Sequence, residues 1–254
     1  MTQEFEDQVV VVTGASAGIG AALAEELSRR GAHLVLAARR HRELEETARR
    51  AGGAEVVVAD VTRRAEVQGI LEAALQRFGR VDTWVNNAGR GISRPLEELG
   101  DGDLDAMIRD NVRSALYGMQ AVLPHFKQRQ QGTLVNVSSM LSRVPFATIR
   151  SAYSASKAAL NSLTETLRFE LARDHPGIRV VLVLPGVVAT DFGHNALGGG
   201  PDSRALPGAQ AVGEAARIIA DGLAAGMADI YTRPDGLELV LSHLRGLASQ
   251  GSRR

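Results

Sequence analysis

The sequence contains no cysteine, so the protein has neither disulfide bridges nor a thiolate nucleophile. A chain without thiols is typical of a reducing compartment, and we therefore expect it to act in the cytoplasm. An excess of charge of one sign is also missing, because 29 basic residues balance 29 acidic ones. This balance gives no electrostatic reason to expect nucleic acid or an acidic surface as a partner.

Long hydrophobic runs are absent as well. No stretch approaches the roughly 18 apolar residues that a membrane-spanning helix requires. The start of the chain, MTQEFEDQ, lacks the basic-then-apolar order of a signal peptide, so we expect neither a membrane span nor a secretory leader. The hydrophobic content of 44% is nevertheless ample for a core, and 254 residues suit one large α/β domain better than two.

Apolar segments typical of strands alternate along the chain with helical patterns of about 10 to 25 residues. This alternation predicts a parallel sheet with right-handed crossovers and helices on both faces. Ligands of such sheets bind beyond the carboxyl ends of the strands. The strand candidates are Val9–Val12, His33–Ala38, Glu55–Ala59, Thr83–Asn86, Thr133–Val137, Arg179–Leu184 and a short Asp229–Tyr231.

A glycine-rich turn, Gly14-Ala-Ser-Ala-Gly18-Ile-Gly20, follows the first strand candidate and precedes an amphipathic stretch from 21 to 30. In a phosphate-binding turn, Gly14 permits the tight bend and Gly18 lets the backbone approach a pyrophosphate. Gly20 then lets the helix pack close to the strand. The helix N-terminus adds N–H groups and a favourable dipole. The turn therefore predicts nucleotide binding, and a loop that only reverses the chain is the alternative.

Tyr153 and Lys157 stand four residues apart in the run SAYSASKAALNSLTETLRFEL, which the pattern predicts to be a helix. This spacing places a phenol and an ammonium on one face of the helix, about one turn apart. A nearby ammonium favours the phenolate, so we expect the pKa of Tyr153 to fall below its usual value of about 10. The pair is then suited to general acid–base chemistry. A half-buried tyrosine beside a solvated lysine is the alternative.

Six motifs together resemble the short-chain dehydrogenase/reductase family, in its branch of single-domain chains of about this length. The similarity extends from about Gln8 to Thr190. It implies an α/β fold, namely a Rossmann-like doubly wound parallel sheet of about seven strands with helices on both faces, in a single NAD(P)-binding domain spanning residues 1–254. The motifs, in chain order, are Thr13-Gly-x-x-x-Gly-Ile-Gly20, Asn86-Asn-Ala-Gly89, Asn111, Ser138-Ser139, Tyr153-x-x-x-Lys157 and Pro185-Gly186.

The resemblance implies a catalytic tetrad of Asn111, Ser139, Tyr153 and Lys157. Tyr153 would protonate a carbonyl oxygen as hydride arrives, or act as the base in the reverse direction. Lys157 would lower the pKa of Tyr153 and bind the nicotinamide ribose, and a serine hydroxyl would hold the substrate oxygen. Asn111 would support a water that links Lys157 to solvent. A helix residue bonded to backbone is the alternative for Asn111.

The serine of this tetrad has two candidates. The position where the family usually carries it is Met140 in this chain, whereas the Ser138-Ser139 motif selects Ser139 with Ser138 as the alternative. Only one of two adjacent side chains at a strand end can face the site. The offset implies a one-residue insertion in the loop 140–151, in which Ser142 replaces a glycine common in the family.

The end of the second strand candidate indicates the cofactor. Folds that prefer NAD place an acidic residue there to bind both ribose hydroxyls, and this strand ends without one. Arg39 and Arg40 follow, and guanidinium groups attract a 2′-phosphate through charge-assisted bonds. We therefore favour NADP(H), with Arg39 as the first candidate and Arg40 as the second. NAD(H) is the alternative, because the arginines also suit a solvated helix and Ala17 stands where NADP-preferring relatives often carry a basic residue.

The resemblance also implies cofactor contacts along the carboxyl edge of the sheet, and it implies no metal. Asp60 and Val61 resemble an adenine-contacting pair, although an aspartate is equally suited to capping a helix that begins at Thr62. A purely structural role is the alternative for Asn86. The predicted cofactor contacts are Gly14, Ser16, Gly18, Ile19, Gly20, Arg39, Arg40, Asp60, Val61, Asn87, Ala88, Gly89, Tyr153, Lys157, Pro185, Gly186, Val188 and Thr190.

Three loops are expected to line the substrate pocket, namely 90–95, 140–150 and a substrate loop at about 190–207. Their apolar members suit a lipid-like, alicyclic or aromatic ketone or alcohol, and packing of a lid on the body is the alternative. His194 and Arg150 are candidates to bind a polar group, or are simply solvated. The glycine-rich stretch 197–203 is expected to be a mobile loop.

The leading functional hypothesis is an NADP(H)-dependent oxidoreductase that interconverts a ketone or aldehyde and an alcohol, working in the direction of reduction. The alternatives are an NAD(H)-dependent alcohol dehydrogenase, a cofactor-binding sensor without turnover, and an enzyme of enoyl reduction or epimerisation. The resemblance further implies a homodimer or homotetramer built partly on the helix that carries Tyr153. The amphipathic stretch 236–248 is expected to cover an oligomer interface or to pack on the core.

Overall fold

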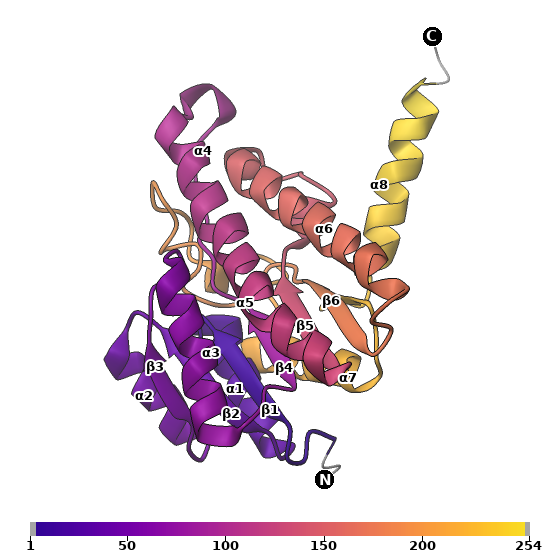
Figure 1. The fold of residues 1–254 in the computed structure, drawn as a ribbon. Helices are drawn as coiled ribbons and strands as arrows, with labels where there is room; N and C mark the ends of the chain where they lie inside the picture. The colour runs from indigo at the N-terminus through magenta and orange to yellow at the C-terminus, as the bar shows by residue number, and fades with distance from the viewer. Residues whose placement is uncertain (1–3, 252–254) are drawn as a thin grey trace.

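Seven parallel strands form one sheet in the order β3-β2-β1-β4-β5-β6-β7 (Figure 1). The computed structural model describes residues 4–251 of the chain. The strand order reverses between β1 and β4, and the crevice at such a switch point is the usual ligand site of open α/β sheets. The strands are β1 (Val9–Thr13), β2 (His33–Ala38), β3 (Glu55–Val58), β4 (Thr83–Asn86), β5 (Gly132–Val137), β6 (Ile178–Leu184) and β7 (Asp229–Tyr231).

Helices connect the strands and cover both faces of the sheet. The long helices are α1 (Gly18–Arg29), α2 (His41–Arg50), α3 (Arg64–Phe78), α4 (Asp101–Ile108), α5 (Ser114–Arg129), α6 (Ser151–Ala172), α7 (Val212–Ala224) and α8 (Gly236–Gly251). The short ones are the 3₁₀ turns η1 (Leu96–Glu98), η3 (Met140–Ser142), η4 (Thr148–Arg150) and η5 (Ser203–Ala205), and a π-helical turn, η2 (Arg109–Arg113), that joins α4 to α5.

The core consists of two layers, one on each side of the sheet. Successive side chains of a strand point to opposite faces, and every residue of β1 is buried, so this strand contributes to both layers. Val10 and Val12 pack with apolar residues of α1, α2 and α7. Val11 packs with those of α3, α5 and α6 on the other face. The doubly wound α/β fold expected from the sequence is confirmed.

The predicted strand boundaries are correct to within one residue. Thr13 joins β1 because it pairs with Ala37, and β5 and β6 each start one residue early because Gly132 pairs with Ile178. β3 ends at Val58, which is the last partner of β2, so the predicted extension to residue 59 is wrong.

The helix cap at Asp60, which the sequence left open as the alternative to an adenine contact, is not formed. The carboxylate of Asp60 accepts hydrogen bonds from the backbone N–H of Thr62 (3.0 Å) and from its hydroxyl (2.8 Å). These bonds close a local turn, and α3 begins later, at Arg64. Helix α1, in contrast, begins earlier than expected. The amphipathic stretch was expected from residue 21, but the helix already begins at Gly18, within the glycine-rich turn.

A chain of buried amides joins β4 to β5 and to α6. Asn86 donates to the side-chain oxygen of Asn136 (2.9 Å) and accepts from the indole N–H of Trp84 (2.8 Å). Asn136 in turn donates to the hydroxyl of Thr164 on α6 (2.9 Å). Asn86 therefore has a structural role, the alternative that the sequence left open, and its network fixes the helix that carries Tyr153.

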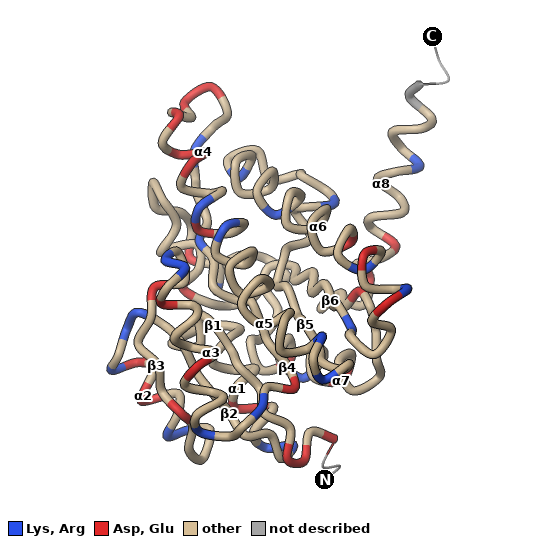
Figure 2. The backbone as a smooth tube through the Cα atoms, in the orientation of Figure 1, with Lys and Arg blue, Asp and Glu red and all other residues tan. Residues whose placement is uncertain are grey.

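The last helix, α8, projects away from the body of the molecule (Figure 1). Val240 is buried at its base, but five leucines of α8 are largely exposed, namely Leu237, Leu239, Leu241, Leu244 and Leu247. Figure 2 shows both signs of charge interspersed over the body and few charges along this helix. Core packing of the whole segment, one of the two expectations, is therefore wrong. No helix within residues 4–251 is long and apolar enough to cross a membrane.

Candidate active site

The glycine-rich turn after β1 has the shape of a phosphate cradle. Gly14 and Gly18 have φ values of +66° and +58°, a region that residues with a side chain rarely adopt. A Cβ on Gly14 would lie 2.8 Å from the Cα of Ala88, and one on Gly20 would lie 2.4 Å from the amide nitrogen of Asn87. These glycines are therefore required by the close approach of the turn to the chain after β4.

Thr13 and Asn87 bind this turn to the end of β4. The side-chain amide of Asn87 donates to the carbonyl oxygens of Thr13 (2.9 Å) and Gly14 (3.2 Å). The hydroxyl of Thr13 accepts from the backbone N–H groups of Asn87 (3.1 Å) and Ala88 (3.3 Å). Asn87, predicted as a cofactor contact, thus uses its amide to hold the cradle. Ser16 lies on the cradle, and Ile19 packs against the core below it.

The far wall of the cradle is formed by the segment after β6. A Cβ on Gly18 would lie 3.4 Å from the methyl group of Thr190, so the glycine turn and Thr190 face each other. Pro185 accepts from the backbone N–H of Met140 (2.8 Å), and the N–H of Gly186 donates to the hydroxyl of Thr232. Val188 is buried and bridges to residue 210. The glycine turn, the segment after β4 and the segment after β6 fit a dinucleotide lying across the switch point.

Gly89 stands where the cradle meets the candidate catalytic residues. A Cβ there would lie 2.7 Å from the side-chain oxygen of Asn111 and 3.3 Å from the Nζ of Lys157. The ammonium group and the amide are therefore packed directly against the backbone after β4. This contact places Lys157 at the cofactor side of the site.

Tyr153 lies in the first turn of α6, buried and next to Ser139. The hydroxyl of Ser139 forms a hydrogen bond with the phenol of Tyr153. The hydroxyl of Ser138 points the other way and donates to the side-chain oxygen of Asn161 at 2.6 Å. Of the two adjacent serines, Ser139 therefore is the one beside Tyr153.

The pKa of Tyr153 differs from the expectation. Burial raises the pKa of Tyr153 to about 12. The hydrogen bond from Ser139 and the charge of Arg150 lower this pKa, but they offset only part of the effect of burial. Lys157 does not have the predicted effect, because its ammonium donates to the carbonyl oxygen of Val137 (2.8 Å) and lies 5.9 Å from the centroid of the Tyr153 ring. The predicted fall in the pKa of Tyr153 is thus wrong for the protein alone, in which the phenol keeps its proton at neutral pH.

Lys157 is itself perturbed by its surroundings. Burial disfavours the charged form and lowers the pKa of Lys157 to about 8. The group is 3% exposed and donates only to a neutral carbonyl oxygen, so no described carboxylate compensates its charge. Electrostatic interactions are stronger in a buried site, so an anion or hydroxyl placed beside this ammonium would stabilise its charged form strongly.

Asn111 is fully buried in the π-helical turn between α4 and α5. Its side chain accepts from the backbone N–H of Arg90 (2.8 Å) and donates to the carbonyl oxygen of the same residue (2.9 Å). It also donates to the hydroxyl of Ser156 (3.1 Å), which lies one residue before Lys157. Asn111 therefore fixes the segment after Gly89 against α6, in line with the backbone-bonded alternative.

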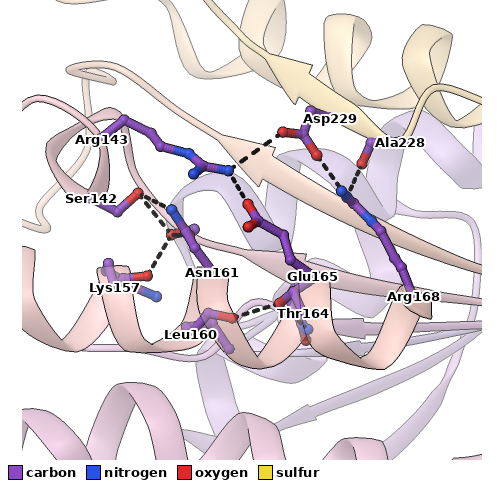
Figure 3. A network of polar contacts seen from close by, with 12 residues as sticks. Ser142, Arg143, Lys157, Leu160, Asn161, Thr164, Glu165, Arg168, Ala228 and Asp229 are labelled. Carbon is purple, nitrogen blue, oxygen red and sulfur yellow. Dashed lines mark hydrogen bonds and ion pairs between the residues drawn. The ribbon is translucent and has the colours of Figure 1, made fainter. Parts of the chain in front are cut away.

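The loop after Ser139 is held by Asn161, a residue that the sequence analysis missed. The amide of Asn161 donates to the hydroxyl of Ser142 at 2.7 Å (Figure 3). The hydroxyl of Ser142 in turn donates to the carbonyl oxygen of Ser139. Ser142, present in place of a glycine, thus supports the residue beside Tyr153. The spacing of four residues from Lys157 to Asn161, on one helix face, was a signal that would have found it.

Arg143 connects the same loop to the opposite edge of the sheet. Its guanidinium lies between the carboxylates of Glu165 on α6 and Asp229 on β7 (Figure 3). Arg168 binds the other oxygen of Asp229 at 2.6 Å. This ion-pair network ties η3, α6 and β7 together, so the loop after Ser139 is a fixed part of the site.

The two arginines after β2 lie beside the cradle in different ways. Arg40 donates to the hydroxyl of Ser16 through Nε (3.3 Å) and Nη2 (3.0 Å). Arg39 is exposed and contributes its charge to the environment of Asp60. Burial raises the pKa of that carboxyl, but the hydrogen bonds from Thr62 and the charge of Arg39 outweigh it and lower the pKa. Val61 next to it packs on the core.

Two residues of the substrate-side loops meet near Tyr153. The ring of Phe192 packs edge-on against that of Tyr153, with centroids 5.5 Å apart. The guanidinium of Arg150 lies close enough to affect the pKa of Tyr153 and donates to the carbonyl oxygen of Ile92 (3.0 Å). Arg150 was named from the sequence as a candidate to bind a polar group, and Phe192 lies in the expected substrate loop. Their meeting could not be predicted, because it depends on how three loops fold together.

Known proteins are similar to this chain in sequence and fold. The family described as short chain dehydrogenase matches residues 8–197. An uncharacterized oxidoreductase of Staphylococcus epidermidis is 37% identical over 197 residues, which cover 75% of this chain and 84% of the relative. A short-chain dehydrogenase/reductase from Burkholderia phymatum, solved in complex with NAD, has a TM-score of 0.87 at 28% identity and covers 97% of this chain and 96% of its own. One from Sphingobium yanoikuyae, in complex with NADPH, has a TM-score of 0.80 at 31% identity and covers 95% of each chain.

The fold and the site thus define a dinucleotide-dependent oxidoreductase with a serine–tyrosine pair beside the cradle. The chain belongs to the short-chain dehydrogenase family. It is an NAD(P)-dependent enzyme that acts on CH–OH and C=O groups.

The pKa of Lys157 leads to a prediction about pH. Because this pKa is lowered, the ammonium is charged below about pH 8 and neutral above it. Tyr153, with a pKa of about 12, stays protonated over the same range. We expect kcat/KM for ketone reduction, at saturating reduced cofactor, to fall as the pH rises through about 8. In Lys157→Arg the guanidinium stays charged, so any remaining activity should lose this descending limb. An identical limb in that variant would contradict the assignment.

Proposed function

We propose that the protein is an NADP(H)-dependent carbonyl reductase that converts a ketone or aldehyde into an alcohol. The observation that carries this proposal is the position of the buried Tyr153 phenol, bonded to Ser139 at the carboxyl edge of the sheet. Gly89 brings Lys157 to the same edge. The site therefore combines a proton donor, a hydroxyl that can orient a carbonyl and a cofactor cradle at one edge of the sheet.

Each residue of the predicted tetrad has a role in this reaction. Bound at the cradle, the cofactor supplies the hydride. The hydroxyl of Ser139 holds the carbonyl oxygen, where negative charge develops, and Tyr153 gives that oxygen a proton. Lys157 stabilises the resulting phenolate and binds the ribose of the cofactor. Asn111 positions the segment from Gly89 to Arg90 beside Lys157, the role that its hydrogen bonds support.

The proposed direction, reduction, follows from the preference for NADP(H), and the protonation state of Tyr153 agrees with it. A phenol with a pKa of about 12 is fully protonated at neutral pH and is thus ready to donate. Oxidation of an alcohol needs the phenolate at the start, which burial disfavours. In the free enzyme Tyr153 is therefore in the protonated state that reduction requires.

Several further statements belong to the same proposal. Residues 1–254 form one cofactor-binding domain, and 190–207 is its substrate loop. The enzyme acts in the cytoplasm on a small molecule with an apolar skeleton. A sensor without turnover is the alternative from a different class, but it has no need of a serine, tyrosine and lysine arranged for proton transfer.

The first test is Tyr153→Phe. We expect this variant to retain NADPH binding, because the other predicted cofactor contacts remain, and to lose ketone reduction by about 100-fold or more, because it lacks the proton donor. The loss is measured as oxidation of NADPH by absorbance with a panel of ketones and aldehydes. Ser138→Ala is the matched control, since Ser138 points to Asn161. Reduction that survives in Tyr153→Phe would contradict the role of Tyr153, and cofactor binding without turnover in the wild type would favour the sensor.

The preference for NADP(H) is supported by the charges after β2. Arg40 reaches the cradle at Ser16, and Arg39 is near Asp60. No acidic residue stands at the end of β2 to repel a 2′-phosphate. We propose that both guanidinium groups bind this phosphate.

The cofactor prediction is tested on single variants. Arg39→Ser and Arg40→Ser should each raise the KM for NADPH by about tenfold and leave the KM for NADH unchanged, because only NADPH carries the phosphate. Arg42→Ser removes an exposed charge from the first turn of α2 and should alter neither value. A wild type that prefers NADH would show that the two arginines only begin α2.

We further propose that the protein is a homo-oligomer in which α8 packs against a second copy of itself. The apolar side chains of α8 recur at spacings of three and four residues, which gives one continuous stripe (Leu237, Leu241, Leu244 and Ala248). Glu238 and Arg245 pair beside this stripe at 3.3 Å. An antiparallel second helix would place Glu238 of one copy beside Arg245 of the other. Charge complementarity therefore favours a second copy as the occupant.

Sedimentation or light scattering tests this interface. Leu244→Glu should reduce the oligomer mass at micromolar concentration, because it places a carboxylate in the stripe. Ser242→Glu, on the polar side of the same helix, should leave the mass unchanged. If Phe169→Glu dissociates the oligomer and Leu244→Glu does not, the contact lies on α6, where Phe169 is 82% exposed, and the α8 interface is wrong.

A further inference from the structure

Arg150 is a half-buried cation without a carboxylate partner among the described residues. Its Nη1 donates to the carbonyl oxygen of Ile92 (3.0 Å), which is the one hydrogen bond of its side chain within residues 4–251. Most other half-buried arginines pair with Asp or Glu, namely Arg30, Arg80, Arg94, Arg129, Arg143, Arg168 and Arg233. Burial disfavours the charge of Arg150 and lowers its pKa. A guanidinium in this position has unused donors and a desolvated charge.

A second unsatisfied donor lies next to this guanidinium. The hydroxyl of Ser93 is buried and has no hydrogen-bond partner in the described part of the chain. A Cβ on Gly200 would lie 2.5 Å from this hydroxyl and 3.1 Å from Nη2 of Arg150. Ser93 and Arg150 therefore lie close together beneath Gly200 of the substrate loop, where the carbonyl oxygen of Gly193 is 2.8 Å from the same Cβ position. Buried hydroxyl groups are rarely left unpaired, so the two donors together are suited to an acceptor from outside the chain.

The two donors are also close to the reacting end of the site. A Cβ on Gly91 would lie 2.8 Å from Nη1 of Arg150 and 2.9 Å from the ring of Phe192. Phe192 packs on Tyr153. The guanidinium is thus about one aromatic ring away from the phenol.

We propose that Arg150 and Ser93 form an anion subsite, and that the substrate is an oxo acid whose carboxylate binds there. The inference rests on the proposed function for the carbonyl end of the substrate. A carboxylate accepts two bonds from one guanidinium and a third from a hydroxyl, which satisfies both unused groups. Phe192 and the apolar loop residues then contact the skeleton between carboxylate and carbonyl. Specificity arises because a neutral ketone leaves the desolvated cation without a partner.

The first experiment compares oxo acids with their methyl esters as substrates, using aryl ketones with short spacers of different length. We expect the wild type to prefer the acid. Arg150→Gln should raise the KM for the acid by about 10- to 100-fold, as expected for the loss of a charged hydrogen-bonded pair. The kcat/KM for the ester should fall by clearly less than that for the acid, because the ester loses only the effect of Arg150 on the pKa of Tyr153. Ser93→Ala should raise the KM of the acid by about threefold to tenfold. Arg217→Gln, which removes an exposed charge from α7, is the control for net charge.

A second experiment separates this subsite from the reductase activity. Calorimetry measures the binding of cyclohexanecarboxylate and of the neutral cyclohexanecarboxamide to the protein–NADPH complex. We expect the carboxylate to bind more tightly in the wild type and in Tyr153→Phe, and the difference to disappear in Arg150→Gln. If no ketone is reduced, the proposed function fails and this comparison still decides the subsite.

Two results would overturn the inference. One is equal binding of the carboxylate and the carboxamide by the wild type. The other is a preference for the carboxylate that persists in Arg150→Gln. Should that variant fail to fold, because Arg150 also bonds to Ile92, Arg150→Lys and Ser93→Ala provide the same comparison. Arg150→Lys keeps the charge but not the two-pronged geometry, so it should retain only part of the preference.

Discussion

The hydrogen bonds between Thr13 and the chain after β4 hold the two halves of the site together. One hydroxyl accepts from two successive backbone N–H groups and donates to the carbonyl oxygen of Val85. The amide of Asn87 returns two bonds to the start of the glycine turn. These contacts close the gap at which the strand order reverses. The cradle, Gly89 and everything packed on Gly89 take their positions from this junction.

Much of this architecture could be predicted from the sequence because it depends on local pattern. The β-branched run of β1, the glycines after it and the spacing of Tyr153 and Lys157 are all properties of short segments. Strand ends were correct to within a residue because most ladders end close to the limits of an apolar run. A helix cap at Asp60 could not be told apart from a local turn in the sequence, since both use the same carboxylate bonds.

What the sequence could not give depends on contacts between distant segments. The choice between Ser138 and Ser139 is decided by Asn161, which attracts the first hydroxyl and leaves the second for Tyr153. The pKa of Tyr153 is decided by burial, which depends on the whole core and here outweighs the nearby cations. Arg150 and Ser93 meet only because the segment after β4, the start of α6 and the substrate loop converge. None of these distances has a signature within one segment.

The π-helical turn at Arg109–Arg113 sets the relative orientation of α4 and α5. A π turn contains one residue more than an α turn, which corresponds to a rotation of about 100° between the faces on either side of it. In a continuous α-helix this rotation would be missing. The contact of α4 with α6, the contact of α5 with the sheet and the inward direction of Asn111 could then not all be kept. The extra residue therefore works as a fixed angular offset. Deletion or insertion of a single residue there would change the rotational register of all the helix that follows, even though every side chain of the site were still present.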